Sequence, residues 1–318
     1  TDFVINEIMF DTAGSDGPNE FFELRYTPGG QVTVPADTFL IANEADSSGT
    51  GEIQFVFDVG GLQTNADGFL VVFQEDNGYG ITSGDGVYVA SGSGSGWSDT
   101  RSSISGDIEN AGTTFFLISS PMVDAATLDG FDLDTNNDGT PDALPASITI
   151  ADSVGIGDDS NSTLYGAINF SPGTPTTPSG STLVTTAGGD YGYVARNGNT
   201  TGSTPNDWVA SNDPSVTAAG VFTLDTTETV PASRQGYTGA SFASENFETP
   251  SLSLQNNLAA NLSAPAGVDD AVIVDVTVST DGGRIALESL TWTVNLGNGA
   301  QLSDIEDFAV YAEAGALS

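Results

Sequence analysis

The sequence predicts an all-β protein built as a β-sandwich, and three observations support this prediction. Apolar and polar residues alternate in several short runs, which is the period of a strand with one face on a core. The 318 residues include 39 Gly and 14 Pro, so turns are frequent and the strands between them are short. Helical periodicity is almost absent, and the best candidate is a short turn at 303–308.

Runs of strand-like sequence occur at four places in the first part of the chain: 21–26, 53–59, 69–73 and 115–118. The first two runs alternate, so that Phe22, Leu24 and Tyr26 share one face of their strand while the charged residues point to the other. The last two runs are continuously apolar and are bounded by Gly, Asn or Asp, which is typical of central strands buried on both faces.

Between about residues 160 and 250, clear strand patterns are less frequent. The Pro/Thr-rich segment 171–180 predicts a loop, because proline cannot donate ladder hydrogen bonds. Segments 191–196 and 208–210 predict short strands or segments docked on the first domain, and 242–250 predicts a linker. We therefore expect residues 1–245 to form one β-sandwich domain with long loops and a C-terminal extension.

The segment 251–318 predicts a second, smaller β-sandwich module, in which strand texture returns at 271–279, 287–294 and 308–311. Three or four strands are few for a sandwich, and no closing strand follows them in the sequence. We expect this module to be truncated or to take a strand from a neighbouring chain.

The charged residues are strongly unbalanced, with 43 acidic against 5 basic residues and a formal net charge of -38. All five basic residues are arginine, and His and Cys are absent, so Ser-His-Asp and Cys-His nucleophilic sites and the usual zinc sites cannot be built. Without lysine there is no P-loop or pyridoxal phosphate anchor. We expect no enzyme and no nucleic-acid partner, and the lack of an 18-residue apolar run predicts no membrane insertion.

The acidic charge favours a salty or calcium-containing medium, where screening relieves the self-repulsion of the folded chain. Halophilic adaptation alone is an alternative explanation. Together with the absence of cysteine, the composition is compatible with secretion by a bacterium that does not rely on disulfides.

Five short motifs carry a family resemblance: Val4–Met9, Asn19–Leu24, Leu144-Pro145, Asp152-Ser153-Val154 and Ser171-Pro172-Gly173. In this order they resemble bacterial lamin-tail-like domains over roughly 1–175, with Arg25-Tyr26 as a departure where an Asn-type loop residue is common. The resemblance implies an immunoglobulin-like β-sandwich and a secreted or surface-attached, non-catalytic module. The segment 251–318 is similar to small β-sandwich modules found beside carbohydrate-active domains.

One loop combines oxygen-bearing residues with the spacing of a calcium site. Counting from Asp134, side-chain oxygens stand at positions 1, 3, 5 and 9, a glycine stands at position 6 and a backbone carbonyl at position 7. The residues that would bind calcium are Asp134, Asn136, Asp138, Thr140 (through its carbonyl) and Asp142. Asp132 or the remote Asp152 would complete the shell. Position 12 is Pro145 rather than Glu, so the loop is not an EF-hand and is closer to dockerin-like and thrombospondin-type-3 calcium loops.

The alternative for this loop is an Asp/Asn/Gly turn with solvated carboxylates. Segment 129–142 carries five carboxylates, which repel one another unless a cation is present. We therefore favour Ca²⁺ as the bound ion.

The remaining candidate groups are weaker. Acidic residues also gather around the first hairpin, where they fit either a polar strand face or a second cation site: Glu7, Asp11, Asp16, Glu20 and Glu23. Trp97, Trp208 and Trp292 could stack on sugars, but a Trp in a β protein more often belongs to the core.

These observations favour an extracellular, calcium-stabilised structural or adhesive protein of a bacterial cell surface or fibre. Its partners would be further copies of itself or other surface proteins. The alternative is a non-catalytic carbohydrate-binding or accessory region of a larger secreted hydrolase, with a polysaccharide as partner.

Overall fold

The computed structural model describes residues 2–13, 18–46, 49–92, 96–110, 112–121, 124–142, 147–188, 191–217, 221–239, 242–247, 252–256 and 276–280. The protein is nearly all β and sandwich-like, which confirms the predicted fold class. The chain divides into two units, Thr1–Thr249 and Pro250–Ser318. Within the described ranges, no helix is long and apolar enough to cross a membrane.

The first sheet of the N-terminal unit has seven strands and is antiparallel except at β5–β6. In spatial order its strands are β15 (Thr229–Val230), β12 (Trp208–Asn212), β11 (Tyr191–Arg196), β1 (Phe3–Met9), β2 (Phe21–Tyr26), β5 (Phe69–Phe73) and β6 (Val87–Val89). The segments expected at 191–196 and 208–210 are therefore full members of this sheet, and β11 pairs directly with β1.

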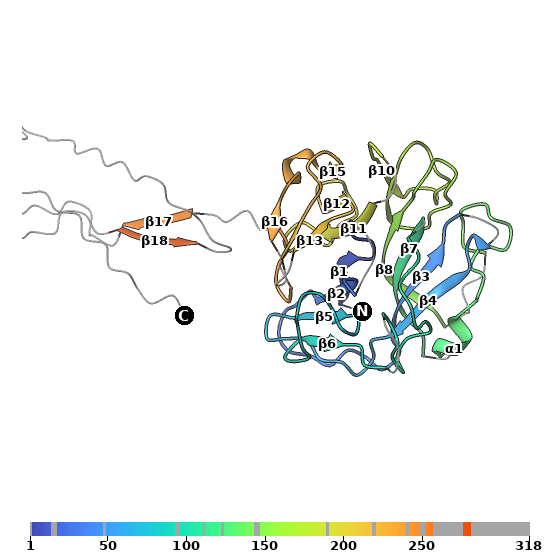
Figure 1. Ribbon diagram of the computed structural model, residues 1–318, viewed down its shortest axis with the longest axis horizontal. Coiled ribbons are helices and arrows are strands. Elements are labelled where there is room, and N and C mark those ends of the chain that lie inside the picture. Colours follow the sequence, from blue (N-terminus) through green and yellow to red (C-terminus); the bar gives the residue numbers. More distant parts are fainter. Residues whose placement is uncertain are drawn as a thin grey trace, which may run out of the picture. The chain divides into compact units, whose positions relative to one another are not determined.

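The second sheet has six strands and is antiparallel from β8 to β4, with parallel pairing at β8–β9 and β9–β10. In spatial order its strands are β10 (Thr182–Thr185), β9 (Ile168–Ser171), β8 (Thr149–Ile156), β7 (Thr113–Ser119), β3 (Thr38–Glu44) and β4 (Ile53–Asp58). Figure 1 shows the β1–β2–β5 group and the β3–β4–β7–β8 group as separate layers of this unit.

The main core lies between the two sheets and draws alternate side chains from both. Phe22 and Leu24 of β2 meet Phe55 of β4 and Phe115 of β7 there, and the buried ring of Trp97 stacks on Phe22. The two apolar runs predicted to be central strands form β5 and β7, and both strands are buried on both faces, as expected.

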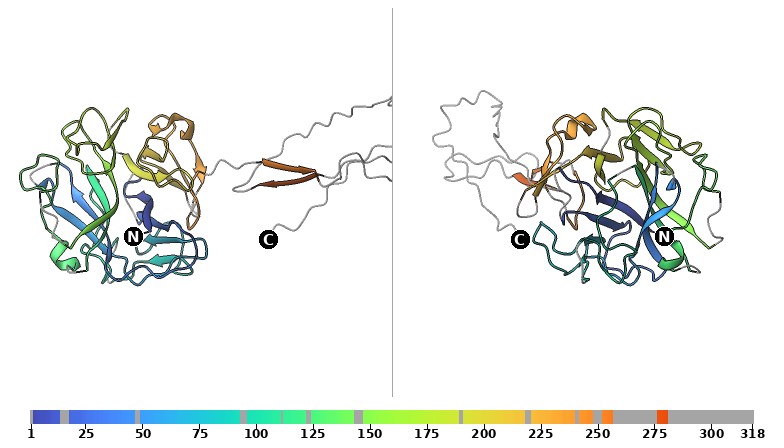
Figure 2. Two further views of the ribbon diagram at one scale, coloured as in Figure 1. Left: turned by 180° about the vertical axis from the view of Figure 1, so that it is seen from behind. Right: turned by 45° about the vertical axis from the view of Figure 1, so that its right-hand side comes forward.

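Each sheet also has a covered outer face. A small sheet of β13 (Ser215–Thr217), β14 (Val221–Thr223) and β16 (Thr238–Gly239) contributes Phe222 to an apolar cluster on the seven-stranded sheet. Helix α1 (Ala125–Leu128) and the segment after it pack Leu128 and Leu133 on β3, β4 and β7 of the other sheet. Figures 1 and 2 show α1 beside β4, and Ala232–Arg234 forms a short 3-10 helix.

Two sequence-based expectations need correction. The charged face of 21–26 is buried rather than exposed, because the outer face of the seven-stranded sheet is covered. The predicted linker at 242–250 is in part a docked segment: the ring of Phe242 lies 4.9 Å from that of Phe21, and Phe247 is buried. An aromatic pair in a polar stretch anchors this segment to the sheet.

In the second unit, the described residues form one antiparallel pair of strands, β17 (Leu252–Asn256) and β18 (Val276–Thr280). Strand β18 overlaps the run predicted at 271–279. The strands predicted at 287–294 and 308–311 and the turn at 303–308 lie outside the described residues.

Candidate metal site

The calcium-type loop is fastened to the start of β4 by backbone hydrogen bonds. The amide of Ile53 donates to the carbonyl of Phe131 at 2.9 Å, and the amide of Leu133 donates to the carbonyl of Gly51 at 2.9 Å. Leu133 is buried against the six-stranded sheet and anchors the loop from below. Two apolar residues, Phe131 and Leu133, alternate with Asp132 and Asp134 at the start of this polar loop, and they attach it to the sheet.

Asp134, the first residue of the motif, is fully buried. Its Oδ2 accepts hydrogen bonds from the amide of Gly139 at 2.7 Å and from the hydroxyl of Tyr165 at 2.9 Å, and its Oδ1 accepts from the amide of Asp138 at 3.2 Å. Burial, and then the hydrogen bond to Asp134, raise the pKa of the Tyr165 hydroxyl above its ordinary value, so this hydroxyl remains a donor.

The other short polar side chains fold back on the loop as a series of Asx turns. Asp132 Oδ1 accepts from the amide of Asp134 at 2.9 Å. Asn136 Oδ1 accepts from the amide of Asp138 and Asp138 Oδ1 from the amide of Thr140, each at 2.9 Å. These bonds consume one acceptor position on each side chain and leave further lone pairs on the same oxygens.

The last ligand of the motif, Asp142, is held by the loop itself. Its carboxylate accepts from the hydroxyl of Thr135 at 2.7 Å and from the side-chain amide of Asn136 at 3.2 Å. Its backbone amide donates to the carbonyl of Leu133 at 2.8 Å, which closes the loop at its base.

Two residues give the loop its sharp turn. Gly139 has a φ of +82°, and a Cβ at that position would lie 2.5 Å from Cγ2 of Thr176. Asn137 has a φ of 55°, a region that Asn tolerates better than most residues. With its amide oriented so that the nitrogen faces inward, Asn137 donates to the carbonyls of Thr50 and Asp134 at 2.9 Å.

The structure brings the predicted ligands into one loop but not into one closed shell. Across the described ranges, no three His, Cys, Asp or Glu side chains converge closely enough to hold a metal ion. Asp134 is buried, whereas Asp138 and Asp142 lie nearer the surface and make bonds within the loop. Calcium binding would therefore require Asp142 to exchange its bonds to Thr135 and Asn136 for the ion.

Asp152, the remote carboxylate considered for this shell, has another role. Its Oδ2 accepts from Nη2 of Arg196 at 2.6 Å and from the amide of Ile5 at 2.9 Å. The Arg196 guanidinium also donates to the carbonyl of Ile5 and lies 4.3 Å from the ring centre of Trp208. Asp152 therefore links the two sheets, which leaves Asp132 as the remaining candidate of the two considered for a calcium shell.

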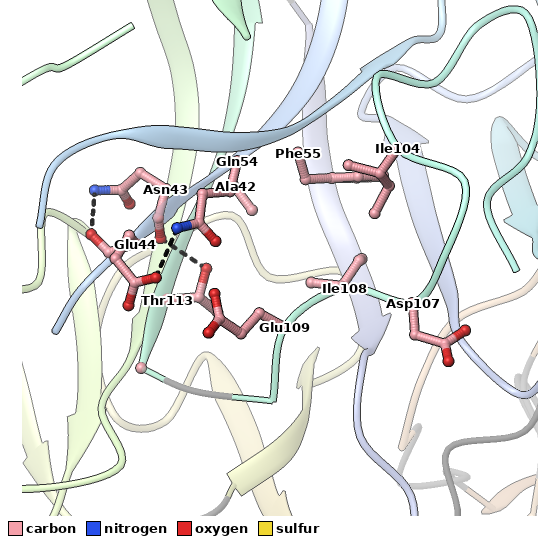
Figure 3. A pocket seen from close by; sticks show the side chains of 11 residues that line it. Ala42, Asn43, Glu44, Gln54, Phe55, Ile104, Asp107, Ile108, Glu109 and Thr113 are labelled. Atoms are coloured by element: carbon pink, nitrogen blue, oxygen red, sulfur yellow. Dashed lines mark hydrogen bonds between the residues drawn. The ribbon is translucent and has the colours of Figure 1, made fainter. Parts of the chain in front are cut away.

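A second acidic group lines a pocket of about 140 Å³ beside β3 (Figure 3). The nearly buried carboxylate of Glu44 accepts from Nε2 of Gln54 at 2.7 Å. Burial, followed by hydrogen bonds with Asp46 and Glu109, raises the pKa of Glu44 to about 8. Sequence reasoning missed this pair because Glu44 and Glu109 stand on segments far apart in the chain, and neither belongs to a spaced motif.

For the acidic residues around the first hairpin, the sequence left a polar strand face and a second cation site open; Glu7, Glu20 and Glu23 are buried, so they form no exposed polar face. Glu20 accepts from Nε1 of Trp97 at 2.5 Å, from Nε2 of Gln74 at 2.8 Å and from the amide of Ile108 at 3.0 Å. Glu7 and Glu23 are buried on the outer face of the seven-stranded sheet, which other segments cover. Segments from elsewhere in the chain supply at least one donor to each of these carboxylates.

Two of the three tryptophans belong to the core, as expected. Trp97 and Trp208 are buried and offer no ring face to a ligand, and Trp292 lies outside the described residues. Asp16 of the first hairpin, and Leu144 and Pro145 of the family motif, also lie outside them.

Comparison with known proteins adds no family to this picture: no family model matches the chain, and a search of curated proteins finds no match.

Proposed function

We propose that this protein is an extracellular structural or adhesive β-sandwich protein of bacterial type, in which Ca²⁺ bound to the loop 132–142 stabilises the N-terminal unit. The observation that carries the proposal is the environment of Asp134. Its carboxylate is fully buried, and it is compensated by two backbone amides and the Tyr165 hydroxyl. In the part of the chain that is described, the single ion pair joins Arg196 to Asp152, so no arginine neutralises Asp134.

A buried carboxylate without a cationic partner is costly, and a bound cation would offset that cost. The loop that contains Asp134 also carries the other predicted ligands: the side chains of Asn136, Asp138 and Asp142 and the carbonyl of Thr140. Hard oxygen donors of this kind, six to eight per ion, are the ligands that Ca²⁺ takes, and its variable geometry tolerates an irregular shell. Asp132 lies next to this group and holds the amide of Asp134.

Binding at this loop would be transmitted to the fold. The loop is bonded to the start of β4 and anchored by Leu133, so an ion that binds only the folded loop stabilises the whole unit by linkage. The net charge of -38 adds a second benefit, because each bound Ca²⁺ removes two negative charges from a self-repelling surface. Both effects favour a role outside the cell, as a scaffold that contacts further copies of itself or other surface proteins.

Isothermal titration calorimetry with CaCl₂ on the full chain tests the proposal. We expect one saturable site in the wild type and its loss in Asp134→Ala. The matched control is Asp67→Asn, which removes one exposed carboxylate outside the loop and should leave binding unchanged. Equal calcium binding by the wild type and Asp134→Ala, or no binding by the wild type, would refute the calcium role.

A further inference from the structure

Two buried glutamates face each other on the outer side of the seven-stranded sheet. Glu7 and Glu23 are direct cross-strand partners in β1 and β2, and both are fully buried. Two like charges directly opposite each other destabilise a strand pair, and they do so more strongly where water is excluded.

The hydrogen-bond partners of this pair favour a carboxyl group that keeps a proton. Oε1 of Glu7 accepts from the hydroxyl of Tyr193 at 2.5 Å, whereas its Oε2 has no hydrogen-bond partner among the described residues. Both oxygens of Glu23 are occupied: Oε1 accepts from Nδ2 of Asn6 and Oε2 from the amide of Ala243, each at 2.6 Å. The free Oε2 of Glu7 is one position open to a proton, because no donor hydrogen occupies it.

The other titratable groups around the pair do not neutralise both charges. Arg25 shares the face of Glu23, but its guanidinium donates to Asn199 and to the carbonyl of Thr200, and it forms no ion pair within the described chain. Tyr193 of β11 and Tyr79 are the other titratable side chains near Glu7, and burial raises the pKa of both hydroxyls further. Burial, and for Glu23 also the charge of Glu7, raise the pKa of both carboxyls, that of Glu7 to about 8.

The cover over the pair is the docked segment 242–247, here called the strap. Its Ala243 amide is the donor to Glu23, and its Asn246 side chain donates to the carbonyl of Asn6 at 3.3 Å. The ring of Phe242 packs edge-on against Phe21 at 4.9 Å, next to the acid pair. Ala243 has a φ of 60°, a strained conformation for a residue with a side chain, which its contacts must maintain.

We propose that Glu7 and Glu23 together hold one proton that keeps the strap on the sheet, so that loss of this proton releases the strap. With both carboxylates charged, the pair repels itself and gains hydration only when the strap lifts and admits water. The strap is the last described part of the N-terminal unit before residue 250.

Hydrogen–deuterium exchange of peptides covering the strap, measured on the full chain as a function of pH, tests the proposal. Between about pH 4.5 and about pH 8, the glutamate pair holds a proton when the strap is closed and loses it when the strap is open. After correction for the intrinsic exchange rate, protection of the strap should fall by up to about tenfold per pH unit across that range and then level off.

Glu7→Gln is the diagnostic variant, because it keeps an acceptor for Tyr193 and cannot ionise. Its strap should remain protected at high pH, whereas the control Asp67→Asn should follow the wild type. Phe242→Ala should open the strap at every pH, which shows that the measurement reports strap opening. A wild-type strap whose protection does not change with pH would overturn the proposal. Restoration of protection at high pH by CaCl₂ in the Asp134→Ala variant, which lacks the proposed loop site, would also overturn it, since the pair would then be a cation site.

Discussion

At the scale of single residues, the charged side chains of this protein divide into those that solvent screens and those that hold the fold together. Arg196 belongs to the second group: it is fully buried, its Nε donates to the carbonyl of Ile5 at 2.8 Å, and its Nη2 pairs with Asp152 at 2.6 Å. These contacts join β11 and β1 of one sheet to β8 of the other. The guanidinium of Arg196 therefore links the two sheets through polar contacts.

Replacing Arg196 by Met should lower the free energy of unfolding by about 3–5 kcal/mol, because the change leaves the Asp152 carboxylate buried and uncompensated. The loss of its stacking on Trp208 adds to the effect. Urea denaturation followed by tryptophan fluorescence measures it. The double variant Asp152→Leu with Arg196→Met should recover part of the stability, since both charges are removed. A single variant as stable as the wild type would show that the pair is not a structural link.

At the scale of elements, the loop 132–142 depends on one residue for its turn. Gly139 combines a φ of +82° with a close approach to Thr176. Gly61 has nearly the same φ, +80°, but nothing lies within 4 Å of a Cβ added there. The two glycines therefore separate the cost of the backbone conformation from the cost of the contact.

Substitution by Ala at each position makes this comparison. Gly61→Ala should cost about 1 kcal/mol of unfolding free energy, the usual penalty for a side chain in the left-handed region. Gly139→Ala should cost about 2–3 kcal/mol, because the loop must also move away from Thr176. Thermal denaturation of both variants measures the difference. Equal losses would mean that Thr176 yields freely and that the loop is not tightly built.

The elements also show what sequence pattern can and cannot predict. The apolar runs 69–73 and 115–118 were predictable as buried strands, because burial on both faces leaves a local signature. The burial of Glu7 and Glu23 was not predictable, since the alternating pattern of 21–26 gives no sign that a segment 220 residues later covers the polar face. The docked Phe242 was missed for the same reason: its partners come from β2 and β5.

The candidate metal site also has features that the local sequence predicts and features that it does not. The spacing of Asp134, Asn136, Asp138 and Asp142 is local, and the structure places these residues in one loop. The hydrogen bond of Asp134 with Tyr165 and the ion pair of Asp152 with Arg196 join distant segments. Local spacing carries no information about such contacts. The sequence could therefore suggest Asp152 as a calcium ligand only because it is a carboxylate.

At the scale of the whole molecule, the net charge of -38 weakens the folded state at low ionic strength, and bound cations oppose that weakening. The sandwich has a large apolar core between its two sheets. Calcium would add to this stability through one loop on the outer face of the six-stranded sheet.

The most direct test of this account is the thermal unfolding of the full chain by scanning calorimetry, with saturating Ca²⁺ and with chelator, at one fixed ionic strength. With free calcium at about 100 times its dissociation constant, linkage adds about 2.7 kcal/mol. For a domain of this size that corresponds to a rise in Tm of roughly 5–10 °C. The rise should be absent in Asp134→Asn. A wild-type Tm that is the same in calcium and in chelator would contradict the account.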